Sequence, residues 1–276
     1  DALSGEIRLG MTEVEVYGEY FPRGEAIAWM EEGRFTLERL ELNRPRARGE
    51  ESLLVRGSIG KGYAANLEVQ AGGVRLEQLD NLIRRDVPLS GDVTLDMHVG
   101  GTLMEPEPSG RLSLHNTWLA NRSLDETTIF FTTEEGVMAI NGGVVGQRLG
   151  MEGWIELWQQ QRYAFHAELD RFPLHVLYPE APDGSPVRSL VDGQVKLEGA
   201  TAEPVKIDAT FSEVSLNWGE HELRSEAPWR FRQDGDAFTI QDVSLSGGQT
   251  ALRFGGSRSA DGQILLAGEG GLDLDL

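Results

Sequence analysis

Cysteine is absent from the sequence, which excludes disulfide bridges and thiolate metal sites. Histidine is scarce, and no pair of histidines has the i, i+4 spacing of metal ligands on a helix. We therefore expect structural or solvated roles for the five that are present, and we predict no metal site and no cofactor. These five residues are His98, His115, His166, His175 and His221.

Basic residues are few, with 25 Lys and Arg against 45 Asp and Glu, so the formal charge is -20. Such an acidic chain repels phosphate backbones, and we predict no nucleic-acid partner. Long hydrophobic runs are also lacking. Runs such as Ile264–Ala267 fall far short of the roughly 20 residues that span a bilayer. The chain starts at Asp1 without a signal peptide and stops within an alternating pattern, so we expect a piece of a longer protein.

Catalytic motifs are missing as well. The sequence has no G-x-S-x-G nucleophile elbow and no 12-residue calcium loop. Gly57–Gly62 is similar to a phosphate-binding loop, but no helical pattern follows it, so we predict a turn. The acid pairs at 31–32, 50–51 and 134–135 fall at predicted turns, where we expect them to be solvated. We predict that the protein is not an enzyme.

Glycine, in contrast, is abundant, with 34 residues, and alternating Val, Leu, Ile and Phe fill the segments between glycines. Alternation of apolar and polar residues is typical of strands with one buried face. This pattern predicts an all-β fold of many short strands joined by tight turns.

One hairpin pattern occurs three times. An acidic residue adjoins Gly33, Gly136 and Gly235 between apolar strands, and these glycines are 103 and 99 residues apart. Glycine accepts the positive φ that such turns need. The spacing predicts a repeat of about 100 residues and about seven strands. At about 4.8 Å between strands, each repeat would advance the sheet by roughly 34 Å.

We divide the chain into a partial repeat (1–88), a complete repeat (89–189) and a third repeat cut at its C-terminal end (190–276), within one continuous elongated domain. Residues 74–85 have helical spacing of leucines and predict a short helix. The segments 100–110 and 172–189 contain two and four prolines and are predicted as a turn and a loop, the latter with one helical turn at 174–178.

A long sheet with one apolar face must curl or pair to hide that face. We therefore predict an elongated, curved or folded-over β-sheet trough with an apolar interior and one or two short helices, with a closed sandwich as the alternative. The candidate residues for lining a lipid groove are Val93, Leu95, Met97, Leu112, Leu114, Ile129, Phe131, Met151, Ile155, Leu157, Phe165, Leu169, Val195, Leu197, Ile207, Phe211, Phe231, Phe238, Ile240, Leu252, Phe254, Ile264 and Leu266.

Three strings, at 88–93, 101–106 and 109–114, resemble the repeat of the TamB family, in the wider AsmA-like group. The segments 136–145 and 149–157 are also similar to it. The resemblance runs over essentially the whole chain. It implies a β-taco-like repeating groove in the periplasm of a Gram-negative bacterium. It also implies a parent protein with an inner-membrane anchor and an outer-membrane barrel partner of the Omp85 type, both engaged through segments absent here.

The resemblance implies transport of phospholipid towards the outer membrane, with the acyl chains as the partner of the apolar face. A second reading is a chaperone-like factor for assembly or translocation of outer-membrane β-barrel proteins. A third is a non-catalytic β-sandwich that acts as a spacer or binds carbohydrate. The residues themselves leave these three open.

Overall fold

The computed structural model describes residues 4–16, 19–45, 50–76, 89–119, 122–124, 126–158, 161–174, 187–201, 203–218 and 221–271. Nearly all of these residues lie in strands, and the described part contains no α-helix. Its 3-10 residues are those of η1 (Lys61–Tyr63) and the single residues Leu76 and Leu174. The predicted all-β fold is therefore confirmed. The chain has two compact units, residues 1–142 and 143–276. The predicted repeat boundaries stay a prediction.

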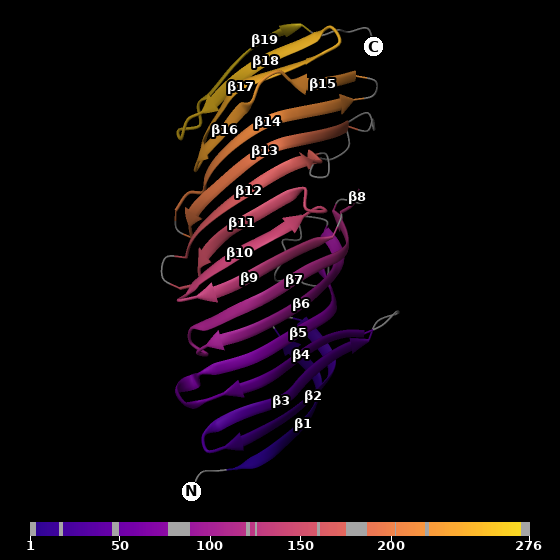
Figure 1. Cartoon of the computed structure of the whole chain (residues 1–276), viewed down its shortest axis with the longest axis vertical. Helices are drawn as coiled ribbons and strands as arrows, with labels where there is room; N and C mark the ends of the chain where they lie inside the picture. Colours follow the sequence, from indigo (N-terminus) through magenta and orange to yellow (C-terminus); the bar gives the residue numbers. More distant parts are fainter. Residues whose placement is uncertain are drawn as a thin grey trace. The chain divides into compact units, whose positions relative to one another are not determined.

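Unit 1 is an antiparallel sheet in which consecutive strands pair from β1 to β7 (Figure 1). The strand β9 pairs with β7 and with β10. The strands are β1 (Gly5–Val16), β2 (Glu19–Glu31), β3 (Arg34–Pro45), β4 (Glu50–Ile59), β5 (Ala65–Arg75), β6 (Leu89–Gly101), β7 (Pro106–Leu119), β8 (Arg122–Ser123), β9 (Thr127–Glu134) and β10 (Val137–Val144), whose last residues pass into unit 2.

Unit 2 is likewise antiparallel, and its strands follow one another in chain order (Figure 1). They are β11 (Leu149–Glu156), β12 (Arg162–Phe172), β13 (Val187–Ala200), β14 (Lys206–Trp218), β15 (His221–Ser225), β16 (Trp229–Asp234), β17 (Ala237–Gly247), β18 (Thr250–Arg258) and β19 (Ile264–Gly271).

The three predicted hairpins are present, joining β2 to β3, β9 to β10 and β16 to β17. Glu32 and Gly33 have φ of 49° and 80°, and Glu135 and Gly136 have φ of 51° and 78°. Two positive φ values in a two-residue loop are typical of a type I′ turn. The third loop begins at its glycine, not one residue before it, so Gly235, with φ of 58°, takes the first position. Glycine there is typical of a type II′ turn.

An interrupted strand recurs once in each unit. The long strand β7 pairs with β8 near its C-terminal end and with β9 over Ser109–Leu114, so β8 and β9 share one side of β7. In the same way β14 pairs with β15 and with β16. From β3 to β9 the chain forms the seven predicted strands. They fill six positions in the sheet, so this stretch advances it by about 29 Å at 4.8 Å per strand, not by 34 Å.

Register shifts bend and twist the sheet of each unit. Shifts occur in β5 at Gly73, in β7 at Asn116, in β12 at Arg171 and in β17 at Asp242, and all four residues have positive φ. An extra residue on one strand bends that strand and increases the local twist. The curvature of the strands within each unit is visible in Figure 1. The predicted curved sheet therefore has a local cause.

Three segments differ from the prediction or lie partly beyond the described residues. The predicted turn at 100–110 is shorter, because Pro106 and Pro108 belong to β7. The ladder with β9 begins only at Ser109, and the Thr133 hydroxyl donates to the Pro108 carbonyl at 2.7 Å. Val74 and Arg75 extend β5, while 77–88, which hold most of the predicted helix, lie outside the described residues. Likewise β12 and β13 take both ends of the predicted loop at 172–189, whose residues 175–186 lie outside.

Candidate functional site

One face of the unit 1 sheet is apolar from one side to the other. Side chains directly opposite one another in neighbouring strands leave the same face of a sheet. The register therefore defines a central row of aligned residues across eight strands. It runs Met11, Gly24, Leu42, Leu53, Ala71, Leu95, Leu112 and Ile129.

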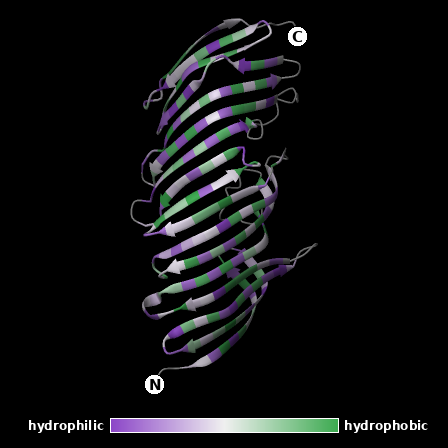
Figure 2. Cartoon of the chain, in the orientation of Figure 1, coloured by the Kyte–Doolittle hydropathy of each residue, from purple (hydrophilic) through white to green (hydrophobic). Residues whose placement is uncertain are grey.

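A second row lies two residues along each strand and is also wholly apolar. It runs Leu9, Ala26, Leu40, Val55, Val69, Met97, Gly110 and Phe131. The two rows together form the apolar face of unit 1. Figure 2 shows the alternation that produces this face as hydrophobic and hydrophilic bands along each strand.

Unit 2 has an apolar face of its own, carried by aligned residues on eight strands. Its central row runs Met151, Ala167, Val195, Ala209, Phe231, Ile240, Gly256 and Leu266. The neighbouring row is less uniform, because Gln233 and Arg258 interrupt a line that otherwise includes Phe165, Leu197 and Phe238. Phe211 stacks on Trp229 beside these rows, with ring centroids 4.4 Å apart.

Neither apolar face is fully covered. Of the described residues, only fourteen apolar side chains are buried, and of the candidate lining residues only Val93 is among them. Most of the others are half-buried, and Phe254, Ile264 and Leu266 are exposed. A closed sandwich would bury both inner faces, as interdigitating sheets do. Partial exposure of most residues in these apolar rows instead leaves surface available to an apolar ligand.

The opposite face is charged. Arg56 Nε lies 2.8 Å from Glu68 Oε2 between β4 and β5, and Arg111 Nη2 lies 3.1 Å from Asp96 Oδ2 between β7 and β6. In unit 2, Arg232 pairs with Asp208 in the same way at 3.0 Å. These exposed cross-strand pairs keep the second face in water and thus fix which face is left for apolar contacts.

The structure brings the predicted lining residues together within each unit. All of them except Leu157, which follows the end of β11, lie on strands and on the apolar face of their unit. The prediction named no lining residue before position 89. The strict alternation of Leu40 and Leu42 around Glu41 would have indicated β3, and its neighbours Leu53 and Val55 lie in the same rows.

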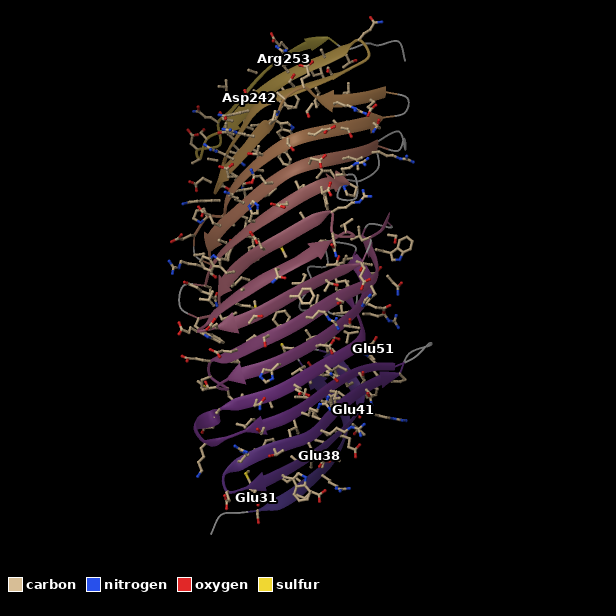
Figure 3. All side chains as sticks on the ribbon, in the orientation of Figure 1. Glu31, Glu38, Glu41, Glu51, Asp242 and Arg253 are labelled. Carbon is tan, nitrogen blue, oxygen red and sulfur yellow. The ribbon has the colours of Figure 1, made fainter. Side chains whose placement is uncertain are left out.

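A buried ionic cluster lies at one end of the apolar face of unit 1. Arg44 Nε donates to Glu51 Oε2 at 2.6 Å, and the Glu51 side chain is 1% exposed. Arg75 Nε stands 3.7 Å from Glu51 Oε1, and both Nη atoms of Arg44 lie 3.4 Å from Glu19 Oε2. The Arg44 guanidinium also lies over the Phe21 ring, 5.2 Å from its centroid. Glu51 is labelled in Figure 3.

This cluster overturns the expectation that the acid pair at 50–51 is solvated at a turn. Both residues belong to β4, and Glu51 is fully buried. A guanidinium that donates to a buried carboxylate compensates part of the hydration that the carboxylate has lost. No local sequence pattern separates Glu51 from Glu134 or Glu31, since the difference comes from Arg44 and Arg75 on neighbouring strands.

Exposed carboxylates elsewhere have lowered pKa values that follow from ordinary neighbours. The pKa of Glu226 is lowered by hydrogen bonds from Ser244 and Ser246 and by Arg253. The Ser259 hydroxyl lowers the pKa of Asp261, and Arg162 lowers that of Glu156. In each case the neighbouring donors stabilise the ionised form of the carboxyl group, and this lowers its pKa. None of these three acids is thereby tuned towards neutral pH, where a general base would operate.

Two hollows in unit 2 are bordered by charged side chains. One, of about 450 Å³, has Lys196, Asp208 and Arg232 among its lining residues. The other, of about 770 Å³, is lined in part by Asp242 and Arg253, which Figure 3 labels.

Across the described residues, no three His, Asp or Glu side chains come close enough together to hold a metal ion. Within the same part of the chain, no helix has the length and hydropathy of a membrane span.

Comparisons with known proteins give no match: no family model, no curated protein and no solved structure has significant similarity to this chain.

Proposed function

We propose that this chain is a segment of a bridge-like envelope protein, similar to the TamB family, and that its apolar face carries the acyl chains of phospholipids. The observation that supports this most directly is the unbroken central row across eight strands of each unit, in which most residues are half-buried. Under this proposal the chain acts in the periplasm of a Gram-negative bacterium. Other segments of the parent protein would anchor it in the inner membrane and engage an outer-membrane barrel.

The energetics favour lipid as the occupant of such a face. Removing a chain of about sixteen carbons from water, at about 0.8 kcal/mol per CH₂, is worth on the order of 12 kcal/mol. An apolar row that continues from strand to strand offers this gain at every position along the sheet. A bound chain can therefore shift along the rows without leaving apolar contact, which is what transport requires.

Adjacent phenylalanines provide a matched test. Phe131 lies on the apolar face and is half-buried, whereas Phe130 faces the other side and is exposed. The protein is purified from a Gram-negative host, and bound lipid is measured by native mass spectrometry with lipid extraction. We expect phospholipid to copurify with the wild-type protein and with Phe130→Asp, and to be lost from Phe131→Asp.

Circular dichroism of both variants checks that the sheet is retained. A wild-type protein that carries no lipid would refute the proposal. Equal lipid loading of the two folded variants would refute it as well, because the charge at Phe131 would then not lie in the path of the lipid.

A second function, sheltering of unfolded outer-membrane strands, is favoured by one feature. Every side chain of β19 is exposed, and among the described strands it pairs only with β18. An exposed edge strand can accept an incoming strand by main-chain hydrogen bonds. Photocrosslinking from Leu265 to a nascent barrel protein, in the absence of lipid crosslinks from Phe131, would support this function over lipid transport.

A further inference from the structure

The apolar face of unit 1 ends in a charged pair. In β3, Arg44 lies two residues beyond Leu42, and in β4, Glu51 lies two residues before Leu53. Side chains two residues apart leave the same face of a strand, so Arg44 and Glu51 continue the line of Leu42 and Leu53. From Arg44 back to Phe35 along β3, the same face spans about 30 Å at roughly 3.3 Å per residue. Leu42 is itself buried, so a ligand lying along this face would contact the half-buried Leu40 and Leu53 first and then a guanidinium.

The carboxylate of Glu51 holds two guanidinium groups at this end. It receives the 2.6 Å hydrogen bond from Arg44 and lies 3.7 Å from Arg75 Nε. Because Glu51 is wholly buried, these contacts act in a medium where charges interact strongly, and they restrict both arginines. The arginines themselves are more accessible, with side-chain exposure of 18% for Arg44 and 40% for Arg75.

The remaining partner of Arg44 is held loosely. Glu19 Oε2 lies 3.4 Å from both Nη atoms, beyond the usual 2.7–2.9 Å of a charge-assisted hydrogen bond. A guanidinium presents a planar fork of donors that matches the oxygens of a phosphate, and a phosphate carries more charge than a carboxylate. A phosphate that approached from the apolar face could therefore replace Glu19 on Arg44 while Glu51 stays in place.

We propose that Arg44 and Arg75 bind the phosphate of a lipid whose acyl chains lie on the apolar face of unit 1. In this arrangement Glu51 is a positioning residue, and Glu19 occupies Arg44 until lipid arrives. The inference rests on the proposed function and deepens it, because it assigns the anionic part of the headgroup to a defined pair of residues. The ligand class is a phosphate monoester or diester attached to a diacylglycerol.

The test compares two lipids that differ only in the phosphate. Dipalmitoyl phosphatidic acid and dipalmitoylglycerol are offered at equal concentration to delipidated protein, and loading of each is measured by native mass spectrometry. Glycerol 3-phosphate, added as a soluble competitor, distinguishes a lipid site from a site for free phosphate. The wild type should load phosphatidic acid in preference, and glycerol 3-phosphate in equal amount should not displace it.

Two variants address the residues. Arg44→Gln with Glu51→Gln keeps a hydrogen-bonding pair but removes its charge, and because Arg75 stays in place it should lower the preference while dipalmitoylglycerol loading is unchanged. Glu19→Gln removes the competing carboxylate and should raise the preference by about tenfold, the equivalent of one charge-assisted hydrogen bond. Should the double variant fail to fold by circular dichroism, Glu19→Gln alone decides the question.

Equal loading of the two lipids by the wild type would overturn this inference and leave the proposed function intact. An unchanged preference in the folded double variant, or in Glu19→Gln, would overturn it as well. Displacement by glycerol 3-phosphate would show a site for free phosphate instead. Failure of both lipids to load would refute the proposed function itself, and this inference with it.

Discussion

Arg44 and Glu51 face each other across the ladder between β3 and β4, with Arg44 Nε 2.6 Å from Glu51 Oε2. The next pair on the same face of these strands, Leu42 and Leu53, is apolar, and Leu42 is 1% exposed. A charged pair thus adjoins the most buried apolar side chain among the described residues of unit 1. Removing two charges from water costs several kcal/mol per ion, and only close hydrogen bonding offsets it.

Loss of one partner of this pair should be severe. Glu51→Ala leaves Arg44 partly buried without its close acceptor, and we expect the free energy of unfolding to fall by about 3–5 kcal/mol. The control is Glu68→Ala, which removes an exposed partner of Arg56 and should cost about 1 kcal/mol or less. Urea denaturation of both variants measures the difference. Comparable losses would show that the cluster at Glu51 is not a buried pair.

Gly57 should tolerate no side chain. Its φ is 137°, and a Cβ atom would lie 2.0 Å from the Asn66 carbonyl oxygen and 2.8 Å from Leu67 Cα, both backbone atoms of β5. We expect Gly57→Ala to destabilise unit 1 by at least about 2 kcal/mol, because β4 and β5 must separate. Gly10→Ala on β1, where no atom lies within 4 Å, should be neutral or stabilise by about 0.5 kcal/mol. Thermal unfolding of the two variants checks this. A higher melting temperature for Gly57→Ala than for Gly10→Ala would contradict the prediction.

The two kinds of hairpin loop should respond differently to asparagine. Glu135 adopts φ of 51° at the first position of a type I′ turn, where asparagine is favoured. Glu135→Asn should therefore raise the melting temperature slightly, by the equivalent of about 0.5 kcal/mol. Asp236→Asn is the control, since that position follows Gly235 in the other turn type and needs no positive φ. A gain from Asp236→Asn as large as that from Glu135→Asn would argue against the assigned turns.

Lowering the pH should weaken the Arg162–Glu156 interaction, which joins β12 to the end of β11. Arg162 Nε donates to Glu156 Oε2 at 3.0 Å, and hydrogen bonding to the guanidinium lowers the pKa of Glu156 below its ordinary value of 4.5. A lowered folded-state pKa means that the unfolded chain binds the proton more readily. The contribution to stability is therefore present above pH 4.5 and is lost as the pH falls through the folded-state pKa.

Carboxyl NMR titration checks this directly. Arg162→Gln should return the Glu156 titration towards its ordinary value, whereas Arg148→Gln, on a neighbouring loop, should leave it unchanged. An unaltered Glu156 titration in Arg162→Gln would show that the hydrogen bond does not form in solution.

Local pattern was sufficient to predict the strands and their apolar face. Alternation assigns each residue to one side of its strand, which is why the predicted lining residues lie on a common face of each unit. The hairpins at Gly33 and Gly136 were predictable for the same local reason, because positive φ favours glycine.

Features that depend on distant partners were not predictable in this way. Whether Glu51 is solvated or buried depends on Arg44 and Arg75, which reach it only through the register of three strands. Pro108 is a second example. The ladder between β7 and β9 begins at Ser109, one residue after Pro108, and the Thr133 hydroxyl donates a hydrogen bond to the Pro108 carbonyl, so Pro108 can belong to β7. Register is a property of pairs of strands, and a single strand's sequence does not contain it.

The shared place of β8 and β9 beside β7 also fixes the relative direction of the hairpin strands β3 and β10. In an antiparallel sheet each step to the next position reverses the chain direction. Two strands an odd number of positions apart therefore run in opposite directions, and two strands an even number apart run in the same direction. Because β8 and β9 occupy one position, β10 lies six steps from β3 and runs the same way. The Glu32–Gly33 and Glu135–Gly136 loops therefore lie along the same margin of unit 1. If the predicted repeat is a duplicated module, each copy would extend the sheet in one direction. The loops of successive copies would then lie along the same margin, and their apolar side chains would lie on the same face.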